Sequence, residues 1–290
     1  MLKVKGQQTD RHKKTKRPLP SLFTRFGHRV QAELAGSIPI DDIQSYTSLR
    51  YHLGWVNQDN KPMTTKKRQG KALRPALCLF ACQALGGEWQ KALPAAAALE
   101  FTHNFSLIHD DIQDGDTERR HQPTVWALWG QPKALVAGDL MHSLSYKVAL
   151  GLTDRGVSNQ KALRSSSLLV QSSLSMIEGQ CLDLAFEGVL DIGIEEYLRM
   201  IRLKTGALIA CSLEVGALLA SNNDSHIEAF ARYGSHLGRI FQIRDDMLGI
   251  WGNEKDTGKA TGNDIRRRKK AFPIVHAMER AGREETKELI

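Results

Sequence analysis

Long apolar segments with short breaks between them dominate this 290-residue chain. From about residue 20 onward, Ala and Leu recur at helical spacing in stretches that mostly exceed 15 residues. Short clusters such as Gly86-Gly87 and Gly130-Gln131-Pro132 separate the stretches. Alternating β-branched runs are scarce, so a sheet is not expected. We predict an all-α fold, a single large helical bundle with a central cavity, with helices within residues 71–86, 92–116, 133–151, 161–187, 193–221, 225–250 and 271–289.

The positive charge lies mostly at the start of the chain. The net charge is +8, and residues 1–17 hold seven basic residues against Asp10, which gives that segment +6. We predict a disordered basic tail over residues 1–20 and one helical domain over residues 21–290. A basic tail also suits a nucleic acid, but no recognised reading motif accompanies it, so we expect no nucleic-acid partner.

Targeting features and cysteines point to a protein of the reducing cytoplasm. The first 20 residues contain no apolar signal core, and no uninterrupted apolar run reaches the ~18–20 residues of a membrane span. Cys78 and Cys82 lie four apart in an apolar helix and are interpreted as core thiols rather than metal ligands. With Cys181 and Cys211 they form no disulfide pattern.

Two apolar helices carry clustered carboxylates at their C-terminal ends. The first cluster contains Asp110, Asp111 and Asp114, and the second contains Asp245 and Asp246, about 135 residues later. Negative charge is unfavourable at a helix C-terminus, and carboxylates at this spacing repel one another. Divalent cations would offset both costs. Oxygen ligands alone favour magnesium, which usually shares its coordination shell with substrate phosphates.

Basic residues stand in three places where they could bind those phosphates. Lys71 and Arg74 open an apolar helix, Arg119 and Arg120 follow the first acidic cluster, and Arg266–Lys270 follow the second. Arginine binds phosphate oxygens through two parallel hydrogen bonds, whereas lysine acts as a point charge. Any one of these groups alone is more typical of a solvated surface.

The ordered motifs resemble the trans-isoprenyl diphosphate synthases, the polyprenyl synthetase family. In chain order these are GKALRP, EFTHNFSLIHDDIQDGDTERR, EGQCLDL, KTGAL, GRIFQIRDDMLGIWG and TGKATGNDIRRRKKAFP, from about Arg50 to Pro273. The resemblance implies the helical fold of that family, usually a homodimer. It also implies a magnesium-dependent prenyltransferase that joins allylic diphosphates to isopentenyl diphosphate.

The resemblance also implies a role for each matching residue. Three magnesium ions per site would be held by Asp110, Asp111, Asp114, Asp245 and Asp246. The allylic diphosphate would be contacted by Arg119, Lys204, Lys259 and Lys269, and isopentenyl diphosphate by Lys71, Arg74, His103 and Arg120. Thr205 and Gln242 would line the reacting carbons, so the catalytic set is Lys204, Thr205, Gln242, Asp110, Asp114 and Asp245.

Some positions depart from the family pattern or bear on product length. Ala72 stands where Arg is usual, and Gly249 makes the second cluster DDxxG. Relatives usually continue with further helices, whereas this sequence ends 17 residues after Pro273. Phe105 precedes Asp110 by about 7.5 Å along the helix axis, at ~1.5 Å per residue. With Ser106 beside it, this aromatic residue is similar to the short-chain enzymes, and it favours a geranylgeranyl product, with farnesyl next.

Two other functions stay open at this point. A terpene cyclase on the same fold would show Ser or Thr and Glu where Gly249 and Asn253 stand, which disfavours it. A catalytically silent regulatory subunit of a heteromeric synthase is disfavoured by the intact acidic clusters, but the short C-terminus is compatible with it.

Overall fold

The computed structural model describes residues 21–40, 44–63, 70–187, 189, 191–252 and 269–281. The proposed basic tail over residues 1–20 and Lys259 lie outside the described residues. The α-helices are α1 (Ser21–Ser37), α2 (Gln44–His52), α3 (Leu73–Ala84), α4 (Leu93–Gln113), α5 (Val125–Trp129), α6 (Gln131–Leu150), α7 (Asn159–Phe186), α8 (Ile194–Ile201), α9 (Ala207–Ala220), α10 (Asp224–Trp251) and α13 (Phe272–Arg280). Short 3-10 helices are η2 (Trp89–Ala92) and η3 (Gly151–Arg155), and η4 (Arg202–Gly206) is π-helical. The all-α prediction is confirmed.

Breaker residues fix where these helices begin. Pro94 and Pro132 occupy the first turns of α4 and α6, where proline costs no hydrogen bond. The Asn223 side chain caps α10 by accepting from the backbone N–H of Ser225 at 2.9 Å. The helices predicted within residues 71–86, 92–116, 133–151, 161–187 and 225–250 match the observed ones to within a few residues. The predicted helix 271–289 is observed as α13, which ends at Arg280, and residues 282–289 lie outside the described residues. Residues 193–221 form α8, η4 and α9 rather than one regular helix.

One small hairpin departs from the helical prediction. Strand β1 (Glu118–Arg119) pairs antiparallel with β2 (Gln122–Pro123), with Arg119 opposite Gln122. Arg120 and His121 at its tip both have left-handed backbone conformations, with φ of 53° and 61°. Positive φ at both central residues is the geometry of the tight turns that suit hairpins. Strands this short leave no alternating pattern in the sequence.

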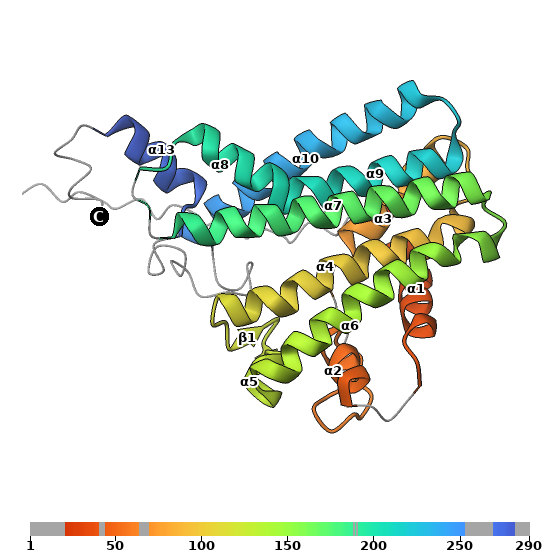
Figure 1. The fold of residues 1–290 in the computed structure, drawn as a ribbon, viewed down its shortest axis with the longest axis horizontal. Coiled ribbons are helices and arrows are strands. Elements are labelled where there is room, and N and C mark those ends of the chain that lie inside the picture. The colour runs from red at the N-terminus through yellow and green to blue at the C-terminus, as the bar shows by residue number, and fades with distance from the viewer. Residues whose placement is uncertain are drawn as a thin grey trace, which may run out of the picture.

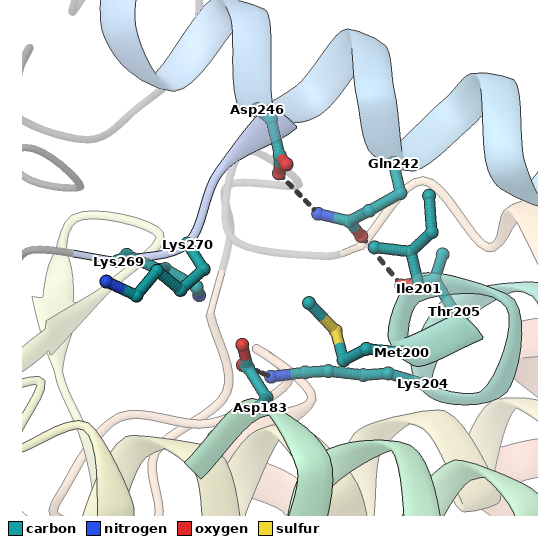
Figure 2. Close-up of a pocket in the computed structure, with 9 residues that line it drawn as sticks. All are labelled: Asp183, Met200, Ile201, Lys204, Thr205, Gln242, Asp246, Lys269 and Lys270. Carbon is teal, nitrogen blue, oxygen red and sulfur yellow. Dashed lines mark hydrogen bonds and ion pairs between the residues drawn. The ribbon is translucent and has the colours of Figure 1, made fainter. Parts of the chain in front are cut away.

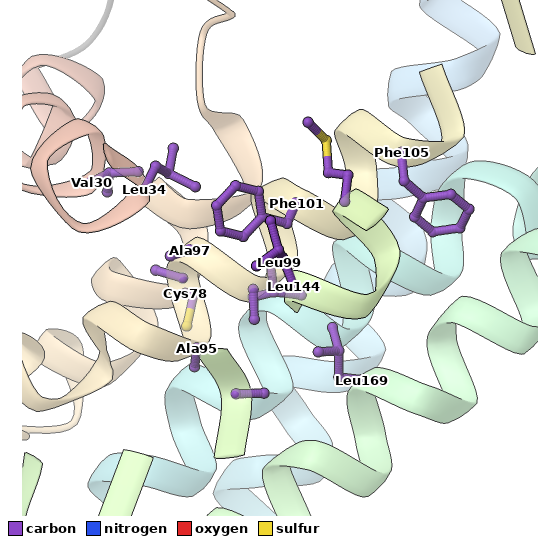
Figure 3. Packing of buried hydrophobic residues seen from close by; sticks show 14 of the residues in the cluster. Val30, Leu34, Cys78, Ala95, Ala97, Leu99, Phe101, Phe105, Leu144 and Leu169 are labelled. Atoms are coloured by element: carbon purple, nitrogen blue, oxygen red, sulfur yellow. The ribbon is translucent and has the colours of Figure 1, made fainter. Parts of the chain in front are cut away.

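The centre of the bundle is built around α4. This helix packs against α6, α3 and α1, while α9 packs against α10, α3 and α7. Ala95, Ala96, Ala97 and Ala98 are buried, and their small side chains let neighbouring helices approach closely (Figure 3). Cys78 and Cys82 lie in the core at 0% and 1% exposure, so their interpretation as core thiols is confirmed.

The arrangement brings several helix ends together. α4, α7 and α10 all finish at the left end of the bundle in Figure 1, where α8 begins and α13 packs against α8 and α10. The stretch Ile194–Ala220 has the length and hydropathy of a membrane span, but 61% of that window is buried within the bundle, as in a core helix.

Candidate active site

The first acidic cluster closes the C-terminal end of α4. Asp114 caps the helix, and Gly115 turns the chain away with φ of 64°. Burial raises the pKa of Asp110 above its ordinary value, and Asp114 adds to the rise, while Lys204, Arg119 and Lys269 oppose it. These opposing charges are lysines and an arginine from three other segments. The Asp110 carboxylate thus lies where cations from across the bundle converge.

Asp111 has a different environment from Asp110. It is 1% exposed, and the Nε and Nη2 atoms of Arg119 both lie 2.7 Å from its Oδ1. Burial raises the pKa of Asp111 to about 6 even though the Arg119 charge opposes the rise. Burial lowers the pKa of Arg119, but the hydrogen bond to Asp111 and the charges of Asp111, Asp110 and Asp116 together outweigh burial, so the pKa is raised overall. In this structure Arg119 is therefore bound to Asp111 rather than free for a diphosphate.

The hairpin that carries Arg119 is fixed to the end of α4. Thr124 Oγ1 and Trp126 Nε1 each donate to the carbonyl oxygen of Asp116 at 2.8 Å. Arg120, at the tip, lies against Gly70, where a Cβ would come within 2.9 Å of the guanidinium Nη2. The hairpin thus brings Arg120 next to the Gly70-Lys71 segment that precedes α3.

Three of the predicted isopentenyl residues, Arg74, His103 and Arg120, influence one another electrostatically beside α4, whereas Lys71 is exposed. Arg74 is 8% exposed, and burial lowers its pKa to about 10 although Glu100 opposes this. Burial also lowers the pKa of His103 well below its ordinary value, with Arg74 and Arg120 adding to the effect. His103 is therefore neutral near pH 7. Within the described part of the chain, Arg74 Nε has no hydrogen-bond partner, which leaves a buried donor for a ligand.

Lys204 and Thr205 lie on η4, the π-helical turn between α8 and α9. Lys204 Nζ donates to Asp183 Oδ2 of α7 at 2.5 Å. On the other side, Thr205 Oγ1 donates to Gln242 Oε1 of α10 at 2.6 Å. Figure 2 shows these contacts around one pocket, which is lined by Asp183, Met200, Ile201, Lys204, Thr205, Gln242, Asp246, Lys269 and Lys270.

The second acidic cluster divides into a buried and an exposed aspartate. Asp246 is 7% exposed and accepts three hydrogen bonds, from Tyr197 Oη at 2.6 Å, Gln242 Nε2 at 2.8 Å and the Phe272 backbone N–H at 2.9 Å. Burial raises the pKa of Asp246, and these hydrogen bonds oppose the rise. Asp245 is exposed. The only aspartate of this pair free to meet a metal directly is therefore Asp245, as far as the described contacts show.

Comparison with known proteins identifies the architecture. A family model described as polyprenyl synthetase matches residues 59–290, which is most of the chain. The chain belongs to the polyprenyl synthetase family. The resemblance inferred from the sequence motifs is thereby confirmed.

The relatives of this polyprenyl synthetase are named for different products. A (2E,6E)-farnesyl diphosphate synthase of Mycobacterium bovis is 46% identical over 232 residues, which are 80% of this chain and 63% of that protein. A geranylgeranyl diphosphate synthase of Mycobacterium tuberculosis is 43% identical over 80% of this chain and 65% of that protein. The chain thus spans less than two thirds of the length of these two relatives.

Solved structures agree with this family assignment. A polyprenyl synthetase from Streptomyces coelicolor superposes with a TM-score of 0.85 at 36% identity, over 93% of this chain and 78% of that one. A geranylgeranyl pyrophosphate synthetase from Pyrococcus horikoshii gives a TM-score of 0.82 at 34% identity, over 93% of this chain and 79% of that one. The fold predicted for the family is the fold observed.

The magnesium expected for the family can be tested against the donors present. Among the described residues, no three His, Cys, Asp or Glu side chains gather closely enough to form a ready-made metal cage. Magnesium does not need one, since it is commonly held by one or two carboxylates plus substrate phosphates and waters. The raised pKa of Asp110, next to Asp114, shows negative charge that the protein leaves incompletely balanced. The donor set fits magnesium delivered with a diphosphate.

Of the two predicted chain-length residues, Phe105 lies on the side of α4 that faces α6. Phe105 is buried, and its ring stacks on His142 of α6 with ring centroids 4.0 Å apart. His142 in turn shares a hydrogen bond of 2.6 Å with Tyr146. Ser106 Oγ donates to the carbonyl oxygen of His103. Phe105 is therefore one member of an aromatic stack that spans two helices.

Sequence reasoning missed some residues of the pocket. Asp183 lies within the EGQCLDL motif, but that motif alone did not identify the partner of Lys204. The signal was the spacing of Asp183 from Gly179, since residues four apart share a helix face. Tyr197 had no signal in the sequence, and Lys270 was noted only as part of the basic run Arg266–Lys270, without a role of its own. Tyr197 holds Asp246, and Lys270 lines the pocket with only 7% exposure.

Proposed function

We propose that this protein is a magnesium-dependent prenyltransferase that condenses an allylic diphosphate with isopentenyl diphosphate, head to tail. The observation that carries the proposal is electrostatic. Lys269 acts on the pKa of Asp110 of α4 and on that of Asp246 of α10, and Lys204 acts on Asp110 as well. The two acidic helix ends therefore share Lys269, and a cation between two acidic helix ends suits a diphosphate that is bridged to metal ions.

The binding roles follow from position and charge. Asp110, Asp114 and Asp245 would hold magnesium, with Asp111 and Asp246 as supports that are already engaged by protein donors. Lys204, Lys269 and Arg119 would contact the allylic diphosphate, with Lys259 assigned by resemblance alone. Lys71, Arg74, His103 and Arg120 would hold isopentenyl diphosphate beside α4.

The chemistry needs a stabilised anion and a protected cation. Magnesium, when bound, would neutralise the diphosphate as it leaves the allylic carbon. Lys204 and Lys269 would add fixed positive charge to the same oxygens as the carbon–oxygen bond breaks. Thr205 and Gln242 would line the reacting carbons and hold the allylic cation against the isopentenyl double bond, so that a carbon–carbon bond forms. The proton then lost from the isopentenyl unit would go to the departing diphosphate.

One assay tests this function directly. The purified chain is incubated with labelled isopentenyl diphosphate and dimethylallyl, geranyl or farnesyl diphosphate, with magnesium or with EDTA. We expect elongation in magnesium and none in EDTA. Release of a cyclic hydrocarbon without use of isopentenyl diphosphate would indicate a cyclase instead. Binding of both diphosphates without elongation would indicate a silent subunit.

We propose geranylgeranyl diphosphate as the main product, with farnesyl diphosphate as the alternative. The Phe105–His142 stack lies about one and a half helical turns before Asp110, where it would limit a growing chain. Phe105→Ala should shift the main product to longer chains, and Ser106→Phe should shift it to shorter ones, as sized by chromatography after dephosphorylation. Unchanged products in both variants would show that other residues set the length.

A homodimer is the proposed assembly, and α7 offers the surface for it. Leu163, Val170, Leu174, Ile177 and Leu184 are all exposed and recur at intervals of three, four or seven along this helix. An exposed apolar stripe of this length is typical of an interface. Leu174→Asp should convert a dimer to a monomer in light scattering. We also propose a cytoplasmic location, since all four cysteines are free.

A further inference from the structure

The π turn η4 interrupts a helix that otherwise reads as continuous from Ile194 to Ala220. Such turns contain one residue more than an α-helical turn and occur often at functional sites. Here the turn carries both Lys204 and Thr205, which point into the pocket of Figure 2. A wide turn is easily lost to the regular α-helix, so the neighbouring helices must hold it in place.

On one side, α7 holds the turn through Gly179. A Cβ at this position would lie 2.2 Å from Lys204 N and 2.6 Å from Lys204 Cα, so only glycine allows this approach. Four residues later on the same face, Asp183 accepts the hydrogen bond from Lys204 Nζ. The helix α7 thus contacts Lys204 twice, once through its backbone and once through its ammonium group.

On the other side, α10 repeats the arrangement. A Cβ at Gly238 would lie 2.6 Å from Gly206 Cα, within the turn. Four residues later, Gln242 accepts the hydrogen bond from Thr205 Oγ1. Each flanking helix therefore presents a glycine followed, one turn later, by a polar side chain that binds the next part of η4.

We propose that Gly179 and Asp183 of α7, together with Gly238 of α10, are positioning residues that clamp the π turn and so set where Lys204 and Thr205 meet the allylic substrate. The glycines bring the helices into backbone contact with the turn, and Asp183 directs the Lys204 side chain. The identity of the substrate that the clamp positions rests on the proposed function, whereas the clamp itself rests on the geometry of η4.

Two alanine substitutions on α10 separate positioning from packing. Gly234, one turn before Gly238, is equally tight, since its Cβ would lie 2.6 Å from Ala210 Cα of α9. Gly238→Ala and Gly234→Ala should lower the melting temperature by similar amounts. Only Gly238→Ala should raise KM for geranyl diphosphate, by about tenfold, with KM for isopentenyl diphosphate unchanged. Equal kinetic losses in both variants would overturn the proposal.

Asp183→Asn supplies a test on α7 that keeps the backbone contact of Gly179. The change preserves shape and an acceptor oxygen but removes the buried charge that pairs with Lys204, so the melting temperature should fall moderately while KM for geranyl diphosphate rises about tenfold. Its control is Glu178→Gln, an exposed carboxylate on the same helix, which should behave as wild type. Wild-type kinetics in Asp183→Asn would remove Asp183 from the clamp.

Hydrogen exchange distinguishes failure of the clamp from failure of the proposed function. If the wild-type chain elongates no substrate, the function is wrong, but the clamp still predicts a result. Amide exchange across residues 203–207 should accelerate in Gly238→Ala and Asp183→Asn and stay at the wild-type rate in Gly234→Ala and Glu178→Gln. Unchanged exchange in the first two variants would overturn the inference.

Discussion

The two acidic helix ends satisfy their buried aspartates in different ways. On α10, Asp246 accepts hydrogen bonds from a tyrosine, a glutamine and a backbone N–H, all of them neutral donors. On α4, Asp111 is paired with the charged Arg119 of the hairpin. The hydrogen bonds of Asp246 are a fixed part of the framework of the fold. The ion pair of Asp111 and Arg119 joins two charged groups that can each exchange the other for a ligand. We therefore expect ligand binding to change the contacts at the end of α4 more than those at the end of α10.

Asp110 on α4 and Asp245 on α10, which adjoin these buried aspartates, also differ in their environments. Burial raises the pKa of Asp110, whereas Asp245 is exposed to solvent. A carboxylate that is partly removed from water and placed beside another gains more from a divalent cation than a hydrated one does. Loss of Asp110 should therefore cost more than loss of Asp245.

The largest expected effect tests this contrast directly. Asp110→Asn should reduce elongation by about a thousandfold or more, because it removes the proposed metal ligand that is partly buried beside another carboxylate. Asp245→Asn should reduce it by about a hundredfold or less, by the same reasoning. Steady-state kinetics at saturating magnesium measure both. Equal losses would show that the two open aspartates are equivalent and would break the comparison.

A smaller effect concerns stability at the buried aspartates. Asp246→Asn replaces one acceptor oxygen by a donor amide that faces other donors, so unfolding free energy should fall by about 2 kcal/mol. Asp111→Asn leaves the Arg119 guanidinium without its buried carboxylate, so the unfolding free energy should fall further, by about 3 kcal/mol. Urea unfolding compares the two variants. A smaller loss in Asp111→Asn than in Asp246→Asn would mean that the ion pair with Arg119 is the weaker anchor.

The smallest effect is a pH dependence confined to the α4 end. Burial lowers the folded-state pKa of His103, so below about pH 6.5 the unfolded chain binds the extra proton and the folded chain does not. Stability should therefore be complete above that pH and fall as the pH drops toward the folded-state pKa. His103→Gln should flatten the decline in melting temperature between about pH 6.5 and 5. An equally steep decline would assign it to other groups, such as His52.

The helical fold and both acidic clusters could be read from the sequence because their signals are local. Apolar periodicity predicts helices. The acidic clusters at the helix ends are evident from sequence spacing, four residues between Asp110 and Asp114 and one between Asp245 and Asp246. The pairing of Arg119 with Asp111 could not be read, because it depends on a hairpin whose strands are two residues long. The partner of Lys204 was missed for a related reason. Asp183 is 21 residues away, and contact arises only through the packing of α7 on η4.

Insertions and deletions should be tolerated very differently along this chain because of η4. A π turn stores one extra residue, so deleting one residue within Arg202–Gly206 would yield an unbroken α-helix at almost no local cost. The rest of α8 would keep its rotation relative to α9, whereas deleting one residue from a regular α-helix would rotate everything beyond it by about 100°, since that helix has 3.6 residues per turn. Tyr197, fully buried, would keep its contact with Asp246. A single missing codon in this segment would therefore spare the fold and remove the turn that carries Lys204 and Thr205.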